Sequence, residues 1–265
     1  MPAEQPALAT TVGAASLRGG PGKSAYFEPT RRRGSRSQPA PRRLGSPVSN
    51  FAGFTTEALD FYDDLEVDNS KAFWDAHKQV YQDHVRGPME ALLAGLEREF
   101  GPAKIFRPYR DVRFAKDKTP YKTHQGAFVA TAEATGWYVE LSARGVMVAG
   151  GFYHAGPDAL ARFRRAVADD VRGPELERLL AKLSRSHWET GGDRLKTAPR
   201  GFDLDHPRIE LLRHRSLTVH KSYGFEPIIH SAELATKIKR DWRQVRPLVE
   251  WVSGQVSGTT VHLTR

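Results

Sequence analysis

The hydrophobic pattern of this sequence changes its period near the middle of the chain, and this change restricts the fold more than any other feature. Between residues 51 and 100 the apolar side chains recur at helical spacing, whereas between residues 126 and 150 they alternate with a period of two. Helical spacing returns after residue 156. A block of strands with helices on both sides is typical of the α+β class. We therefore expect a single domain in which helices flank a mostly antiparallel sheet.

The strand block divides into short segments bounded by turn residues. We expect strands at 126–131, 136–142 and 145–150, and a further one at 216–220. Ala143-Arg144-Gly145 suits a hairpin turn between the second and third of these strands. Strict alternation places Glu140 on the more polar face of its strand, where we expect it to meet water rather than an arginine.

Capping residues and helix breakers delimit the expected helices. Helices are predicted to begin near Thr56, Ser70, Met89, Gly156, Gly173 and Ser231. Gly87-Pro88 should interrupt the chain between the second and third of these helices, and Pro247 should kink or end the last one. The folded domain is therefore expected to span residues 49–254, followed by a short tail at 255–265.

Residues 1–48 differ in composition from the rest of the chain. They are rich in Ala, Gly, Pro, Ser and Arg and carry eight Lys/Arg against two Glu, so they hold +6 of the net charge of +9 and leave +3 for the other 217 residues. A segment with so few apolar residues cannot offset its ordering entropy, which predicts a disordered basic tail. An organelle transit peptide and a start codon assigned too far upstream are alternative interpretations.

Other features of the sequence exclude several classes of site. The chain has no cysteine, which rules out disulfides, thiolate metal ligands and a thiol nucleophile. No apolar run approaches the roughly 18 residues of a membrane span, so we expect a cytoplasmic protein. No glycine-rich nucleotide-binding pattern is present, and the residues point to no particular cofactor.

The stretch from Lys104 to His124, KIFRPYRDVRFAKDKTPYKTH, holds paired polar and aromatic groups more densely than the sequence around it. It contains seven Lys/Arg, two Asp, one His and four aromatic residues. The proline within it favours an extended backbone at the preceding residue, so we interpret residues 106–114 as a strand. Arg110 then shares a face with apolar neighbours and should meet a carboxylate, from Asp111 or Asp117, or an anionic ligand.

The spacing of the charged residues in this stretch matches a family signature. The pattern Arg107-x-x-Arg110-Asp111-x-Arg113-Phe114-x-x-Asp117-Lys118-x-x-Tyr121 resembles that of the DUF2461 family. The resemblance extends from about Phe51 to about Val252 and includes the stretches FAGFTTEALDFYDDL and GFDLDHPRIELLRH. The family has no assigned activity, so the resemblance implies membership but no particular reaction.

The first functional hypothesis is a pocket for an anionic small molecule, in an enzyme or in a binding protein. Guanidinium and ammonium groups of the signature stretch supply positive charge that suits phosphate or carboxylate. Carboxylate, phenol and imidazole groups of the same stretch can orient these cations or transfer a proton, which is consistent with hydrolysis or transfer at a phosphate-bearing substrate. The candidate ligand-binding residues are Arg107, Arg110, Arg113, Lys118 and Lys122, and the candidate catalytic residues are Asp111, Asp117, Tyr121 and His124.

Two other hypotheses fit the same stretch. In one, the charged side chains form a buried ionic clasp between helices and sheet, and removing one member strands the charge of the other. The members of such a clasp would be Arg110, Asp111, Asp117, Lys118 and Glu140. In the other, the domain binds nucleic acid and stacks bases on aromatic rings, although a charge of only +3 outside the tail counts against this. The rings available for stacking are Tyr109, Phe114 and Tyr121.

A loop-rich segment at 186–215 contains a second cluster of ionisable residues. Oxygen and imidazole ligands at such spacing can hold a divalent metal, but the spacing matches no dedicated metal loop, and Asp and His are common in turns. We therefore predict no metal site and expect a carboxylate of this cluster to pair with Arg110 or Arg113. The members of the cluster are Asp203, Asp205, His206, Glu210 and His214.

Overall fold

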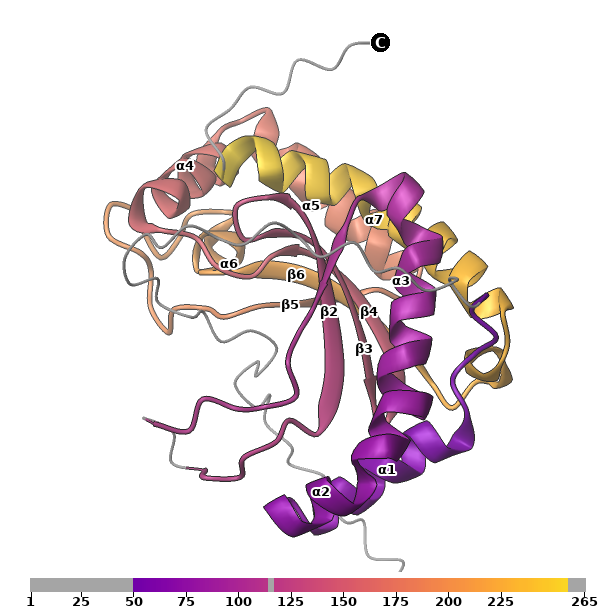
Figure 1. Ribbon diagram of the computed structural model, residues 1–265. Coiled ribbons are helices and arrows are strands. Elements are labelled where there is room, and N and C mark those ends of the chain that lie inside the picture. Colours follow the sequence, from indigo (N-terminus) through magenta and orange to yellow (C-terminus); the bar gives the residue numbers. More distant parts are fainter. Residues whose placement is uncertain (1–49, 114–116, 257–265) are drawn as a thin grey trace, which may run out of the picture.

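A six-stranded antiparallel sheet runs through the domain (Figure 1). The computed structural model of the protein describes residues 50–113 and 117–256. The strands lie in the order β1-β2-β3-β4-β6-β5, and each neighbouring pair is antiparallel. They are β1 (Ala103–Ile105), β2 (His124–Ala132), β3 (Thr135–Ser142), β4 (Gly145–Phe152), β5 (Glu189–Gly191) and β6 (Leu217–Gly224). The expected α+β class with an antiparallel sheet is confirmed.

The middle of the sheet is a meander of three strands that follow one another along the chain. β2, β3 and β4 contain the three segments predicted from alternation and extend them by up to two residues. β3 and β4 pair from Thr135↔Phe152 to Ser142↔Gly145, so the hairpin turn consists of Ala143 and Arg144. The pattern of side chains therefore identified these strands correctly. The three-residue strand β5 lies in the segment that we interpreted as loop.

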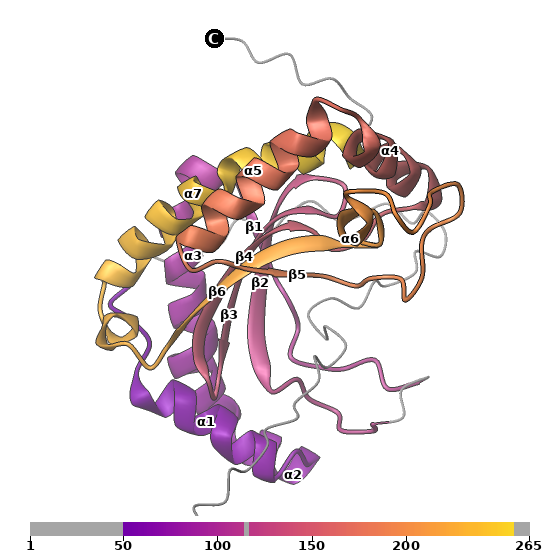
Figure 2. The ribbon, with the colours of Figure 1, turned by 180° about the vertical axis from the view of Figure 1, so that it is seen from behind.

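The long helices cover one face of the sheet (Figures 1 and 2). α7 packs across β2, β3 and β4. α1 packs on β3, α3 on β1 and α5 on β5. The helices are α1 (Thr56–Val67), α2 (Lys71–Val80), α3 (Gly87–Phe100), α4 (Pro157–Ala168), α5 (Arg172–Arg185), α6 (Ile209–Leu212) and α7 (Glu233–Val256). A 3-10 turn, Pro227–His230, precedes α7.

The two faces of the sheet carry different side chains. One set of alternate residues belongs to the main hydrophobic core beneath the helices and includes Val129, Trp137, Val139 and Val148. The other set points to the opposite face, which we call the far face, and forms a second and smaller apolar cluster of Phe128, Tyr138 and Ala149. Because side chains alternate along a strand, the far face also receives His124 and Glu140, which lie an even number of residues from Phe128 and Tyr138.

Both prolines that we expected to break helices are accommodated within helical backbone. A π-helical segment, Tyr81–Arg86, continues from α2 and leads into α3 without a break. Pro88 is the second residue of α3 and follows directly on the π-helical segment, in which the Gly87 N–H donates to the Gln82 carbonyl, so the proline lies within continuous helical backbone. Pro247 lies inside α7, which continues to Val256 and so passes the expected domain boundary at residue 254. The predicted interruption at Gly87-Pro88 is therefore wrong, and so is a helix end at Pro247.

None of the helices within residues 50–113 and 117–256 combines the length and apolar character needed to cross a bilayer. The predicted disordered tail at 1–48 lies outside the described residues and stays a prediction.

Candidate functional site

The signature stretch forms an irregular two-stranded ribbon that extends the β1/β2 edge of the sheet. Tyr109 and Tyr121 form an antiparallel bridge. Next to it, the Arg110 N–H donates to the Pro120 carbonyl at 2.8 Å, and the Lys122 N–H donates to the Pro108 carbonyl at 2.8 Å. We call residues 106–113 and 117–123 the signature ribbon. A regular strand at 106–114 was predicted, but only β1 is regular, and Phe114 lies outside the described residues.

The charged side chains of the ribbon pair with one another. One guanidinium nitrogen of Arg110 donates to Asp117 Oδ2 at 2.5 Å and also to the Thr119 hydroxyl. The Arg113 guanidinium makes a two-point contact with Asp111, at 2.9 Å and 2.6 Å. The expectation that Arg110 meets a carboxylate is thus met by Asp117. The Arg110 side chain is nevertheless 31% exposed and that of Asp117 56% exposed, so the pair is not deeply buried.

These contacts make the two aspartates poor candidates for a general base. The hydrogen bonds from Arg113 lower the pKa of Asp111 to about 2. Backbone and hydroxyl hydrogen bonds from Thr119, together with the Arg110 guanidinium, lower the pKa of Asp117 to about 2. A carboxylate with such a pKa is a weak proton acceptor at neutral pH. Asp111 and Asp117 therefore act in this geometry as partners that orient the arginines.

The remaining cations of the ribbon differ in their surroundings. Lys118 is exposed, and its ammonium group donates to the Val112 carbonyl at 2.9 Å rather than to a carboxylate. Lys122 places its ammonium 5.3 Å from the centre of the Phe106 ring, within the range of a cation–π contact. Arg107 is exposed and lies close enough to Asp111 to contribute to its low pKa. The clasp hypothesis would pair Lys118 with Asp117 or Glu140, but Asp117 pairs with Arg110 and Glu140 lies next to His124, so the structure does not form this part of the clasp.

Tyr121 faces the helices and not the far face. Its ring is 5% exposed and stacks on the Trp74 indole, with 4.4 Å between ring centres and 8° between planes. The Asn69 side chain accepts a hydrogen bond from the Tyr121 N–H at 2.9 Å and donates one to its carbonyl at 3.1 Å. Tyr121 belongs to the main core beneath the helices, whereas His124 lies on the far face, so the two side chains point to opposite faces. The structure does not bring Tyr121 and His124 together.

His124 begins β2 on the far face and meets a buried carboxylate there. Its Nε2 lies 3.8 Å from Glu140 Oε2 on β3, and the Tyr138 hydroxyl donates to the same oxygen at 2.6 Å. Glu140 is 8% exposed, so the expectation that it meets water is wrong. Gly126 is paired with Glu140, and a Cβ on it would come 2.4 Å from the Tyr138 hydroxyl oxygen. The glycine therefore leaves the space through which Tyr138 reaches Glu140.

Comparison with known families shows which family this sequence belongs to. A family model described as "Conserved hypothetical protein (DUF2461)" matches residues 57–251, which include the ribbon and the far face. The chain belongs to the DUF2461 family. A search of curated proteins finds no match to the sequence.

The electrostatic surroundings of His124 link the DUF2461 signature to the far face. Burial lowers the pKa of the His124 imidazole from its ordinary value. The Glu140 carboxylate opposes this shift, while the positive charges of Lys122 and Arg110 add to it. Two cations of the ribbon therefore act on a histidine that the chain places at the edge of the far face. At neutral pH the imidazole is uncharged and can accept a proton.

Sequence reasoning identified His124 but missed the groups that give it a chemical setting. In the sequence, Glu140 is a single acid in a strand. Its position two residues after Tyr138 shows that the two share a face, but it gives no sign that Glu140 is buried. Gly126 appeared only as the start of a strand. The available signal was register: had the β2–β3 pairing been known, Gly126, Tyr138 and Glu140 would have fallen together.

The ionisable cluster in the DUF2461 chain at 203–214 takes no part in this site. Within the described ranges, no three His, Asp or Glu side chains come together as a metal site would require. Glu210 pairs with Arg213 at 2.8 Å and with Arg194 at 3.6 Å. Arg110 and Arg113 pair with Asp117 and Asp111, so the expectation that a carboxylate of this cluster meets one of them is wrong. His214 is buried, with its Nδ1 2.7 Å from the Ser216 carbonyl oxygen.

Proposed function

We propose that this DUF2461 protein binds a phosphate-bearing or other anionic small molecule on the far face of its sheet, where His124 acts as a proton acceptor or donor. The observation that carries the proposal is the contact of His124 with the buried Glu140 carboxylate, within the influence of two cations of the signature ribbon. Titratable groups held in opposing fields of this kind are common at functional sites.

Each group has a defined role in the proposed site. Arg110 and Lys122 supply the positive charge that attracts the anion. Asp117 and Thr119 hold the Arg110 guanidinium, which reduces the entropy lost when a ligand binds it. Neutral His124 accepts a proton from the bound molecule or from water, and the adjacent Glu140 carboxylate stabilises the imidazolium that forms. Tyr138 fixes Glu140 through its hydroxyl.

A histidine NMR titration of the full chain tests this proposal directly. Without ligand, His124 should titrate below the ordinary range, and phenyl phosphate or inorganic phosphate should raise its pKa because a bound anion stabilises imidazolium. In Glu140→Gln the hydrogen bond from Tyr138 can persist, but the loss of negative charge should lower the pKa of His124 further. Glu66→Gln, an exposed change on α1, serves as the control and should leave His124 unaffected.

Binding measurements complete the test. Arg110→Gln should weaken phosphate binding by about tenfold or more, the effect of losing one charge-assisted hydrogen bond. Arg98→Gln, an exposed change on α3, should bind as the wild type does. Gly126→Ala should disturb His124 without changing any charge, because it displaces the Tyr138 hydroxyl from Glu140. If phosphate leaves the His124 titration unchanged at saturating concentration, the proposed site is rejected.

A structural role for the signature is the second candidate, and the pairing within the ribbon favours it. Arg110 with Asp117 and Arg113 with Asp111 are complete ion pairs without any ligand. Such pairs fix the shape of the ribbon even if nothing binds beside it. The two roles differ in one respect: the structural role predicts that Arg110→Gln changes stability alone, while the binding role predicts an additional loss of anion affinity.

The structure gives less support to nucleic-acid binding. Of the described rings considered for base stacking, Tyr121 is covered by Trp74, which leaves Tyr109, at 48% exposed, as the accessible ring. A protein that stacks bases needs accessible aromatic faces along a basic track. A steep loss of binding with added salt would point to nucleic acid, and saturable binding of phosphate would point to the small-molecule site.

A further inference from the structure

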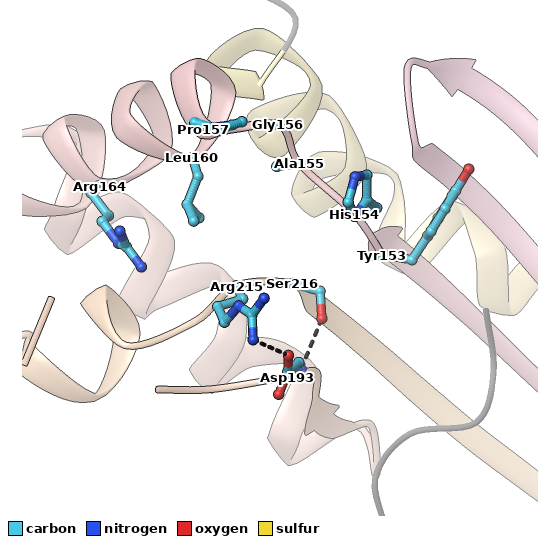
Figure 3. Close-up of a pocket in the computed structure, with 10 residues that line it drawn as sticks. All are labelled: Tyr153, His154, Ala155, Gly156, Pro157, Leu160, Arg164, Asp193, Arg215 and Ser216. Carbon is cyan, nitrogen blue, oxygen red and sulfur yellow. Dashed lines mark hydrogen bonds and ion pairs between the residues drawn. The ribbon is translucent and has the colours of Figure 1, made fainter. Parts of the chain in front are cut away.

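A cleft lies at the other end of the sheet from His124. An open cleft of about 460 Å³ separates the start of α4 from the segment that leads into β6 (Figure 3). Its volume falls within the range of about 300–1,000 Å³ that is usual for small-molecule sites. Tyr153 lines the cleft and follows directly after β4. It lies six residues beyond Met147, which is the partner of Glu140 in the β3–β4 pairing. Six residues of extended chain span about 20 Å, which is the separation along β4 between the level of Glu140 and the cleft.

Two arginines line this cleft. Arg164 reaches down from α4, and Arg215 approaches from the segment before β6 (Figure 3). Burial lowers the pKa of Arg164, and the nearby charge of Arg215 lowers it further. Arg215 pairs with Asp193 at 3.2 Å. Within the described part of the chain, no carboxylate lies within ion-pair distance of Arg164.

The Arg164 guanidinium is held in position by a neutral partner. Its Nε donates to the Leu212 carbonyl at 3.1 Å, which orients the group but does not balance its charge. The Arg215 side chain is 58% exposed and its charge is balanced by Asp193, so the positive charge left without a carboxylate among the described residues of this cleft is that of the half-buried Arg164. The rest of the cleft is partly apolar, because Leu160 and Ala155 contribute to its walls. A ligand that suits these walls carries one anionic group and an apolar part.

We infer that this cleft binds a small organic anion, whose phosphate or carboxylate group is held between Arg164 and Arg215 and whose apolar part contacts Leu160 and Ala155. A guanidinium presents paired donors that match either group. Ser216 and Asp193 support the arrangement from below: Ser216 Oγ accepts from the Asp193 N–H at 2.8 Å, and Asp193 holds Arg215.

Calorimetric titration of the full chain with phenyl phosphate, benzoate and inorganic phosphate tests this inference. At least one of the two aromatic anions should bind saturably and more tightly than inorganic phosphate, and the comparison of phenyl phosphate with benzoate identifies the preferred anionic group. Arg164→Gln and Arg215→Gln should each weaken binding by about tenfold or more. The control, Arg178→Gln, removes an exposed arginine of α5 and should bind as the wild type does.

Thermal unfolding separates loss of binding from loss of folding. Arg164→Gln relieves the repulsion from Arg215, so the variant should remain about as stable as the wild type while losing the ligand-dependent rise in Tm. The inference is overturned if neither aromatic anion binds, or if Arg178→Gln weakens binding as much as the cleft variants do. It is also overturned if binding survives both cleft variants but is lost in Arg110→Gln, because the anion then occupies the His124 site alone.

Discussion

The Tyr121 ring lies parallel to the Trp74 indole, 4.4 Å from it, with the two planes inclined by 8°. This stack joins the signature ribbon to α2, and it makes Tyr121 part of the core rather than of a reactive surface. The phenol ring therefore contributes buried area and stacking to the core.

The stack predicts different outcomes for two changes at the same position. Tyr121→Phe keeps the ring and should alter stability by less than about 1 kcal/mol, with no effect on phosphate binding. Tyr121→Ala removes a buried aromatic side chain and should cost about 3–5 kcal/mol. Urea unfolding of both variants provides the measurement. A loss of anion binding in Tyr121→Phe, with stability unchanged, would instead place the hydroxyl in the site.

Asn69 provides the second attachment of the ribbon. Its side chain pairs with both the N–H and the carbonyl of Tyr121, across 52 residues of sequence. Asn69→Ala leaves two partly buried backbone groups without this partner and should cost about 1–3 kcal/mol. Asn50→Ala, at an exposed position, is the control and should be neutral within about 0.5 kcal/mol. Hydrogen exchange should show faster exchange of the Tyr121 amide in Asn69→Ala, and unchanged exchange would contradict this role.

Stability should depend on pH through buried histidines. Burial lowers the pKa of His214 from 6.5 to about 4, so the unfolded chain binds a proton more readily than the folded one between these values. The free energy of unfolding should therefore fall as pH decreases from about 6.5 toward 4, by about 3 kcal/mol from this residue if its shift is complete. His124, whose pKa is also lowered, contributes in the same direction.

Chemical denaturation at pH 7, 6, 5 and 4 measures this dependence. His214→Gln can keep a donor for the Ser216 carbonyl while removing the titration, so its stability should vary less over this range than that of the wild type. An identical pH dependence in the two proteins would show that His214 does not carry the effect.

Two glycines in regular elements should respond in opposite ways to the same substitution. Gly151 has a φ of +137°, and a Cβ there would lie 2.2 Å from the Leu217 carbonyl oxygen of β6. Gly151→Ala should therefore cost about 3 kcal/mol or more through strain and overlap. Gly95 lies on the exposed side of α3, with no atom within 4 Å of the added carbon, so Gly95→Ala should stabilise by about 0.5–1 kcal/mol. Thermal unfolding compares the two directly.

The sequence by itself determined the class of the fold and most of its elements. Periodicity is a local property, since it follows from the direction of successive side chains along one element. It was therefore sufficient to predict the strands within β2, β3 and β4 and the helices around them. The signature stretch also supplied local information, because Arg110 and its partner Asp117 are only seven residues apart.

Tertiary structure decided which of these residues meet. The contact between Asn69 and Tyr121 spans 52 residues, and the contact of His124 with Glu140 depends on the register of β2 against β3. A shift of β2 by one residue against β3 would turn His124 to the other face of the sheet, so spacing in the sequence could not predict its contact with Glu140. The burial of Glu140 likewise depends on Tyr138 and on the space left by Gly126. Sequence pattern fixed the direction of each side chain within its own element, and only the packing of distant elements fixed its neighbours.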